Sequence, residues 1–237
     1  MLRLATLENI PAINRVLNHP EVYPWATMGQ DIGPLDIAPS FGSLYVLIAE
    51  GDAGCIILDP YDERTMELHT CLLPELRGLP SEEVLRDTLR FVFAETMAME
   101  ILTKVPLANK SADLYTRQAG FIRISDSEDG RAYQFDIERW PYQDASLAGI
   151  CPEELAKGIT DPHYLRVLGA LVLMGMKGYM GKGVSIFNKH ARLHGFPRVD
   201  VVGMDSIAVG GRTIHFEVNT YQVENLCQPS QLSPQAH

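Results

Sequence analysis

The chain has 237 residues, of which 46% are hydrophobic and 21% charged, and its formal net charge is -10. This composition is that of an ordinary globular protein, and it excludes a disordered chain, a collagen-like repeat and a disulfide scaffold. No apolar run reaches the roughly 18–20 residues of a membrane span, and the N-terminus has no signal-peptide pattern. The four cysteines show no C-x-x-C spacing, so we expect no metal site and a reducing, cytoplasmic environment.

In chain order, the hydrophobic periodicity of the first 140 residues predicts strands, helices and one long irregular segment at 19–43. Thr6 can cap the first helix, which extends through Leu17. The predicted strands are 2–5, 44–49, 54–58, 65–73, 101–105, 122–124 and 132–138, and two further helices are 79–96 and 111–119. This order predicts an α/β (α+β) fold, in which a mixed sheet carries helices on both faces.

Residues 141–237 follow a different pattern and are expected to form a C-terminal α+β extension up to 227. Helices are predicted at 152–157, 162–176 and 183–193, and strands at 198–202, 207–209 and 213–218. Gly210-Gly211 is a strong signal for a two-residue hairpin. Residues 228–237 are rich in Pro, Gln and Ser, which is typical of a disordered tail.

The charge also divides the chain into two parts. Residues 1–140 contain 22 Asp or Glu and 12 Lys or Arg, whereas residues 141–237 contain eight of each. Residues 16–63 carry eight acids and no Lys or Arg, and residues 162–199 carry six basic residues and no acid. This asymmetry indicates two regions with different roles, although an acidic surface that serves only solubility would give the same pattern.

The stretch from Glu67 to Gly78 is the most informative about chemistry, because a predicted strand ends there in a turn that leads directly into the helix 79–96. A helix N-terminus presents unpaired N–H groups and the positive end of a dipole. Gly78 allows the backbone to approach a ligand closely. The pattern is therefore typical of an anion site that a pyrophosphate would fill. A plain strand–turn–helix connection without a ligand is the alternative.

Residues 72–78, the predicted strand 101–105 with Pro106 after it, and residues 109–121 resemble, in this order, three motifs of the GNAT family of N-acetyltransferases, which use acetyl-CoA. Residues 72–78 are similar to the end of the family's fourth strand and the start of its pyrophosphate loop, whose pattern Q/R-x-x-G-x-G/A often begins with Arg-Gly, as Arg77-Gly78 does here. Asn109, with Ala112 three residues later and Gly120-Phe121 after eleven, is similar to the family's N-x-x-A…G-F. The resemblance covers residues 2–138 and implies a GNAT-like, mostly antiparallel sheet flanked by helices.

The resemblance also implies acetyl-CoA (CoA) as the cofactor and assigns residues to it. The backbone of Leu72 and Leu73 and the side chain of Asn109 would hold the pantetheine arm, and the pyrophosphate would lie against Arg77, Gly78, Leu79 and Ser81. A helix N-cap role for Asn109 or Ser111 is the alternative. Two residues depart from the family pattern: Pro80 has no N–H to donate, and Glu82 brings a negative charge toward the expected diphosphate.

Three residues are candidates for acid–base catalysis. Glu67 and His69 share one strand face because side chains alternate, and they stand where the family commonly places the base that takes a proton from the amine. The family's general-acid tyrosine would fall at Thr116, whereas Tyr115 comes one residue earlier, about 100° around the helix. A surface carboxylate, a structural histidine and a packing tyrosine are the respective alternatives. Cys71 shares the face of His69 and is expected to be a buried, unreactive cysteine.

These observations favour an acyl-CoA-dependent N-acetyltransferase that moves an acetyl group from acetyl-CoA to an amine. In the resembling fold, part of residues 16–63 walls the acceptor side, so an amine or a basic protein surface is the expected acceptor. Alternatively, the basic stretch 162–199 packs over this acidic region. The acidic pI near 5.1 argues against nucleic acid as a partner, and the glycines of 178–183 fit tight helix packing better than a second phosphate loop.

The competing hypothesis is a GNAT-like protein with weak catalysis that acts by binding another protein. Pro80, Glu82 and the displaced Tyr115 favour it. The chain looks most similar to GNAT-like proteins encoded by tailed phages, which would place it in a host cytoplasm and its partner among host proteins.

Overall fold

The computed structural model describes residues 1–140, 152–156, 158–217 and 220–225. The chain divides into two compact units, Met1–Arg139 and Trp140–His237. The expected disordered tail lies outside the described residues. None of the described helices has the length and apolar character needed to span a lipid bilayer.

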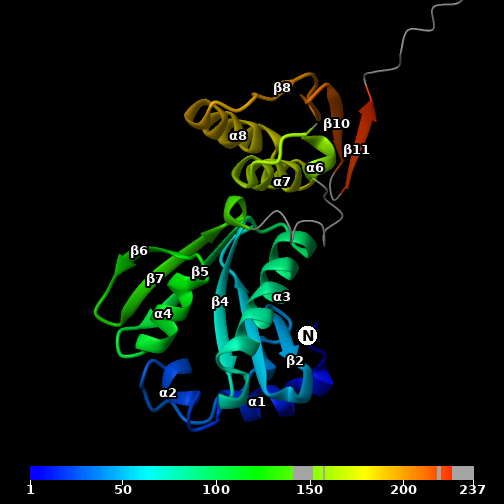
Figure 1. The fold of residues 1–237 in the computed structure, drawn as a ribbon. Coiled ribbons are helices and arrows are strands. Elements are labelled where there is room, and N and C mark those ends of the chain that lie inside the picture. The colour runs from blue at the N-terminus through cyan, green and yellow to red at the C-terminus, as the bar shows by residue number, and fades with distance from the viewer. Residues whose placement is uncertain (141–151, 157, 218–219, 226–237) are drawn as a thin grey trace, which may run out of the picture. The chain divides into compact units, whose positions relative to one another are not determined.

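A seven-stranded sheet forms the framework of the first unit, with the strand order β1-β2-β3-β4-β5-β7-β6 (Figure 1). Its strands are β1 (Leu2–Leu4), β2 (Tyr45–Ala49), β3 (Gly54–Pro60), β4 (Thr65–Leu72), β5 (Glu100–Pro106), β6 (Ile122–Asp126) and β7 (Gly130–Asp136). All neighbouring strands are antiparallel except β4 and β5, which are parallel. The mixed, mostly antiparallel sheet expected from the sequence is confirmed.

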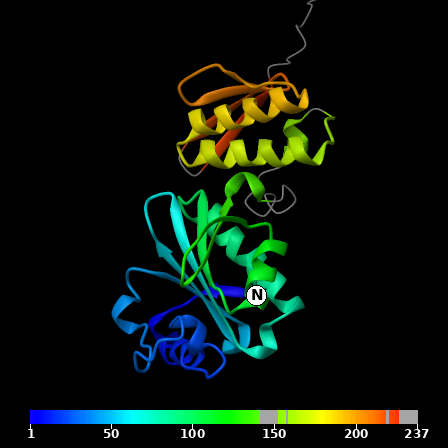
Figure 2. The same cartoon turned by 90° about the vertical axis from the view of Figure 1, so that its left-hand side faces the viewer.

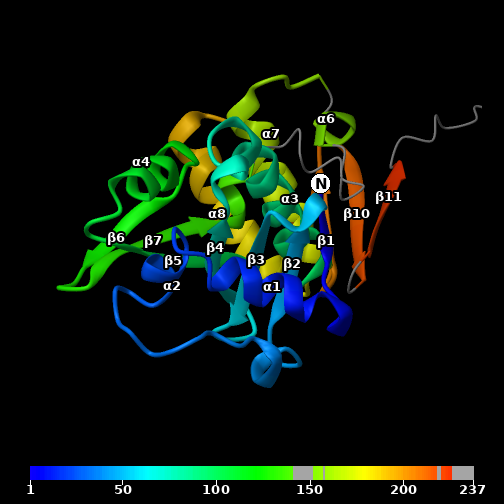
Figure 3. The same cartoon turned by 90° about the horizontal axis from the view of Figure 1, so that it is seen from below.

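Helices cover both faces of this sheet, with α1 on one face and α3 and α4 on the other (Figure 3). The helices of the unit are α1 (Ile10–Leu17), α2 (Tyr23–Ala26), α3 (Leu79–Glu95) and α4 (Lys110–Gln118). On the α1 face, the fully buried Ile13 and Val16 pack with Cys55 and Cys71 of the sheet. On the other face, Phe93 of α3 stacks on Phe135 of β7 with ring centroids 6.0 Å apart. The amphipathic pattern of residues 79–96 therefore predicted α3 to within one residue at its end.

The second unit combines helices with a small antiparallel sheet of order β11-β10-β9-β8. Its elements are α6 (Pro152–Leu155), α7 (Pro162–Met176), α8 (Met180–His194), β8 (Asp200–Val201), β9 (Ser206–Val209), β10 (Arg212–Glu217) and β11 (Thr220–Asn225). Gly210 and Gly211 have φ of 56° and 76°, as the predicted hairpin requires. The sequence analysis did not predict β11.

The helices α7 and α8 lie side by side (Figure 2). A Cβ at Gly183 would stand 2.9 Å from Leu171 Cδ1 and 3.2 Å from Met174 Cβ, so the glycine lets α8 approach α7 without displacing these side chains. Helix packing thus accounts for this glycine, in agreement with the expectation. Helix α8 begins at Met180, three residues before the predicted start, and it includes Gly181 and Gly183.

Candidate functional site

The parallel strands β4 and β5 are paired only where they begin. Their register runs over three residues and ends with Glu67 opposite Leu102. One residue further along, the Thr103 hydroxyl donates a hydrogen bond to the Leu68 carbonyl at 2.8 Å, and the two strands then diverge (Figure 1). The second half of β4 is therefore paired with β3 on one side and leaves its β5 side without a strand partner among the described residues.

Two contacts show to which side the backbone N–H and C=O groups of each β4 residue point. The Leu73 N–H donates to the Ala53 carbonyl at 2.9 Å, so odd-numbered residues turn their polar backbone groups toward β3. Because successive residues alternate, Thr70 and Leu72 direct theirs to the β5 side, where Arg77 Nε donates to the Leu72 carbonyl at 3.2 Å. This edge can accept a ligand that pairs like an added strand. Both backbone groups of Leu73 are already used, since its carbonyl accepts from Leu76 N–H at 3.0 Å.

The turn between β4 and α3 has a specific backbone geometry. Gly78 precedes the first residue of α3 with φ 81° and ψ -136°, a combination that other L-residues rarely adopt. The Ser81 N–H and hydroxyl both donate to the Gly78 carbonyl, and the Arg77 N–H donates to the Pro74 carbonyl at 3.2 Å. Two of the amides expected to face a pyrophosphate are thus used within the chain, and Pro80 has none.

The Arg77 side chain makes a three-point connection across the first unit. Its Nη1 lies 2.8 Å from Glu21 Oε2, its Nη2 donates to the Glu21 carbonyl at 3.2 Å, and its Nε reaches Leu72. Arg77 therefore joins the end of β4 to the segment between α1 and α2, and Glu21 balances its charge. The sequence could not show this ion pair, whose members are 56 residues apart.

The predicted bases lie together on the α1 face of β4, at the point where β4 and β5 diverge. His69 Nε2 is 3.8 Å from Glu67 Oε1, and their side chains are 49% and 38% exposed. Asp59, also exposed, lies directly across from Glu67 on β3. Two carboxylates at a cross-strand position repel each other, so this pair favours a bound cation.

Further along the same face the environment becomes apolar. Cys71 is buried opposite Cys55, which confirms its expected burial, and a hydrogen bond from the Cys55 thiol lowers the pKa of Cys71. The neighbouring Cys71 thiol and burial raise the pKa of Cys55, which keeps that thiol protonated. The polar positions Glu67 and His69 thus border the apolar core under α1.

Tyr115 points from α4 toward the first turn of α3. Its hydroxyl donates to the Ser81 carbonyl at 2.5 Å, and burial, with a contribution from the Glu82 carboxylate, raises the pKa of Tyr115. Thr116, at the position where the family pattern would have its tyrosine, is buried. Tyr115 is therefore the tyrosine of α4 that reaches the predicted loop.

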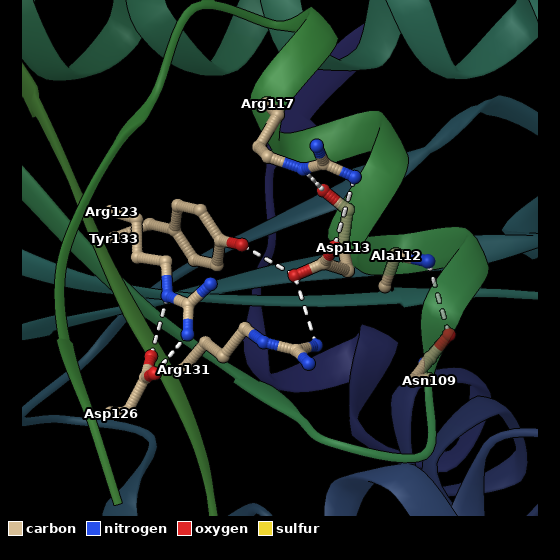
Figure 4. A network of polar contacts seen from close by, with 8 residues as sticks. All are labelled: Asn109, Ala112, Asp113, Arg117, Arg123, Asp126, Arg131 and Tyr133. Carbon is tan, nitrogen blue, oxygen red and sulfur yellow. Dashed lines mark hydrogen bonds and ion pairs between the residues drawn. The ribbon is translucent and has the colours of Figure 1, made fainter.

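Asn109 is the N-cap of α4, where its Oδ1 accepts from the Ala112 N–H at 3.0 Å (Figure 4). This contact bears out the capping alternative for Asn109, and Ser111 is exposed. Because Asn109 Oδ1 already accepts this hydrogen bond, only the side-chain amide nitrogen of Asn109 is a candidate for a ligand contact.

Asp113 anchors α4 to β7 through contacts that the sequence analysis missed. Its carboxylate accepts hydrogen bonds from the Tyr133 hydroxyl and from Arg131 Nη1 at 3.2 Å, and it lies 3.1 Å from Arg117 Nη2 (Figure 4). The spacing of Asp113 and Arg117 indicates a helical ion pair. No sequence signal indicates the contacts to β7, because they depend on how the helix lies on the sheet.

Replacing Asp113 by Asn should lower the unfolding midpoint at neutral pH, because Tyr133 and the two arginines would lose their anionic partner. The hydrogen bond from Tyr133, and then Arg131 and Arg117, lower the pKa of Asp113 in the folded state. A lowered pKa stabilises the fold above the unfolded value near 3.9, and this contribution is lost as pH falls through the folded value. Urea unfolding across acidic and neutral pH measures the difference.

The control is Asp129→Asn, which removes a carboxylate with a 74% exposed side chain that pairs with Lys104 at 3.6 Å. This variant should behave like the original protein at every pH. Equal stabilities of the Asp113 and Asp129 variants at neutral pH would contradict an anchoring role for Asp113.

No protein-family model matches the chain, and no curated protein matches it in sequence. Among solved structures, a spermidine N-acetyltransferase from Vibrio cholerae in complex with CoA and spermine aligns with a TM-score of 0.45 and 12% identity, over 56% of this chain and 92% of its own. A ribosomal-protein-S5-alanine acetyltransferase from Vibrio fischeri aligns with a TM-score of 0.46 and 12% identity, over 59% and 93%. A Streptococcus mutans protein aligns with a TM-score of 0.48 and 14% identity, over 57% and 98%. At this level of similarity, the function has to be inferred from the residues of this chain.

Proposed function

We propose that the first unit is an acetyl-CoA-dependent N-acetyltransferase of the GNAT type, which transfers an acetyl group to an amine. The observation that carries this proposal is the divergence of β4 from β5 after Glu67. It exposes the polar backbone groups of Thr70 and Leu72 to a strand-like ligand, directly before the helix start at Gly78.

The residues of this edge fit the CoA part of the cofactor. The amides of a pantetheine arm can pair with the β5 side of Thr70 and Leu72 once Arg77 Nε leaves the Leu72 carbonyl. A pyrophosphate would lie against the amides of Gly78 and Leu79, where the α3 dipole is positive. Glu82 is exposed, so its carboxylate can remain in solvent.

The acid–base groups follow from the same geometry. Acetyl-CoA would supply the acetyl group as a thioester. Glu67 or His69 would take a proton from the acceptor's ammonium group, and the neutral amine would then attack the thioester carbon. Tyr115 would release the Ser81 carbonyl and donate its proton to the thiolate that leaves as the C–S bond breaks.

A cationic acceptor is supported by the charges around the base. Glu67 and Asp59 face the same side of the sheet at neighbouring positions, and together they attract an amine. Four other acids of residues 16–63 lie at opposite ends of β3, because Glu50 and Asp52 precede this strand whereas Asp62 and Glu63 follow it. The preference for an amine or a basic protein surface therefore depends on Asp59 and Glu67.

One observation favours the second candidate, a GNAT-like protein that binds another protein and has little catalytic activity. Arg77 is paired with Glu21, and the Ser81 amide is bound to Gly78. Pro80 has no backbone N–H, so few hydrogen-bond donors of this turn remain for a diphosphate.

Calorimetric titration of the full chain with acetyl-CoA separates the two candidates, and we expect one binding site. Binding should be followed by acetylation of spermidine or a lysine-rich peptide, but not of an acidic peptide. The rate at low acceptor concentration should fall as salt is added, because salt screens the attraction of exposed charges. Absence of acetyl-CoA binding would favour the protein-binding candidate.

A further inference from the structure

Three histidines of the second unit come together where α7 begins and α8 ends. His163 lies in the first turn of α7, and His190 and His194 are one turn apart on α8. His163 Nε2 is 3.1 Å from His190 Nδ1, and one ring nitrogen from each histidine lies within 4.8 Å of the others. The cluster belongs to neither the predicted cofactor site nor the predicted bases.

Packing fixes the orientation of these rings. Gly195 ends α8 with φ 71°, and the chain turns so that the Phe196 ring stacks on His194 with centroids 5.6 Å apart. The ring centroids of His163 and His194 are 4.4 Å apart. His194 is exposed, whereas His163 and His190 are half-buried. The three nitrogens are therefore held close together at a place that solvent can reach from the side of His194.

The polar contacts of the cluster define its proton arrangement. Arg166 Nη2 lies 2.8 Å from His163 Nδ1, and a guanidinium can only donate. Nδ1 of a neutral His163 is then the acceptor, which assigns its proton to Nε2, from where it can be donated to His190 Nδ1.

We propose that His163, His190 and His194 form a binding site for a transition-metal dication of the Zn²⁺ class. Two imidazole nitrogens bound to a tetrahedral Zn²⁺ at about 2.0–2.1 Å lie about 3.4 Å apart, close to the spacing of His163 and His190. The spacing His190-x-x-x-His194 places two ligands on one helix face.

The donor set determines the class of metal. Three imidazoles suit Zn²⁺, Cu²⁺ and Ni²⁺, whereas Mg²⁺ and Ca²⁺ prefer oxygen ligands. Binding replaces the proton on His163 Nε2 and moves the ring's proton to Nδ1, so Arg166 turns away from that nitrogen. Three protein ligands leave a tetrahedral ion with one position for water. Cysteine spacing gives no sign of this site, whereas His190 and His194 are visible in the sequence at helical spacing.

Titration of the chelator-treated full chain with Zn²⁺ tests the site. We expect one Zn²⁺ per chain and at least a tenfold loss of affinity, about 1.4 kcal/mol, in His190→Ala and in His194→Ala. Mg²⁺ should not compete with Zn²⁺. Co²⁺ should give the visible absorption of a tetrahedral site in the original protein and lose it in both variants.

The matched control is His19→Ala, which removes a histidine of the first unit that accepts from Glu21 N–H at 3.2 Å and should leave metal binding unchanged. Because His194 is exposed, its replacement keeps the second unit folded, which circular dichroism can verify. Equal Zn²⁺ affinities of the original protein, His190→Ala and His194→Ala would overturn the proposal, as would the absence of Zn²⁺ binding to the original protein.

Discussion

Replacing Glu67 by Gln is expected to lower kcat/KM for amine acetylation by about 10²–10⁴-fold, the usual contribution of a positioned general base. Glu67 lies at the last position of β4 that pairs with β5, and His69 Nε2 is 3.8 Å from its carboxylate. If Glu67 is the base, the pH–rate profile of the original protein has an acidic limb that depends on this residue. The Gln variant should then lack the acidic limb of the pH–rate profile.

His69→Ala tests the other candidate, and only the variant that removes the base should lose the acidic limb. Asp59→Asn is the matched control, because Asp59 faces the same side of the sheet opposite Glu67. This control should raise the KM for a cationic acceptor through lost attraction and keep the shape of the profile. If Glu67→Gln and His69→Ala both keep full activity and an unchanged profile, the base is a different group.

Replacing Gly78 by Trp is expected to weaken acetyl-CoA binding at least tenfold, about 1.4 kcal/mol. A Cβ at Gly78 would meet no atom within 4 Å, so the first effect is on the backbone. With φ at 81° and ψ at -136°, a residue other than glycine costs of order 1–3 kcal/mol. The turn would relax this strain and move the Gly78 and Leu79 amides away from the pyrophosphate. Calorimetric titration measures the loss.

Gly33→Trp provides the control, since Gly33 also has φ of 81° and open space around it but lies in the segment before β2. Both variants should lose stability, and only the Gly78 variant should lose acetyl-CoA affinity. Unchanged affinity in a folded Gly78→Trp variant would show that the pyrophosphate does not bind at this turn.

Local patterns predicted the elements of the first unit, because the spacing of apolar residues fixes which face each helix and strand buries. The stripe that includes Val84, Leu89 and Phe93 predicted α3, and all three are buried. The pairing of Arg77 with Glu21 and of Asp113 with Tyr133 could not be predicted in this way. These contacts depend on how distant elements pack, and a single sequence carries no signal for that arrangement.

For the candidate site, the sequence predicted which residues share a strand face and which helix follows. It could not predict that Tyr115 would donate to Ser81, because one residue of helix register decides where that side chain points. The proximity of His163 to His190 and His194 likewise needs the antiparallel hairpin of α7 and α8. Only His190 and His194, which both lie in α8, have a spacing that the sequence shows.

The short pairing of β4 with β5 also has a consequence for folding. The sheet of the first unit consists of two antiparallel parts, the meander β1–β4 and the three strands in the order β5-β7-β6, whose strand pairing is limited to the register from Thr65 to Glu67. This seam closes only after the connection through α3 has been ordered, and closing such a connection costs chain entropy that three residue pairs offset weakly. Because α3 accepts a hydrogen bond from Leu2 N–H of β1 at Asp87 and stacks Phe93 on Phe135 of β7, this helix, more than the strand pairing, keeps the seam closed.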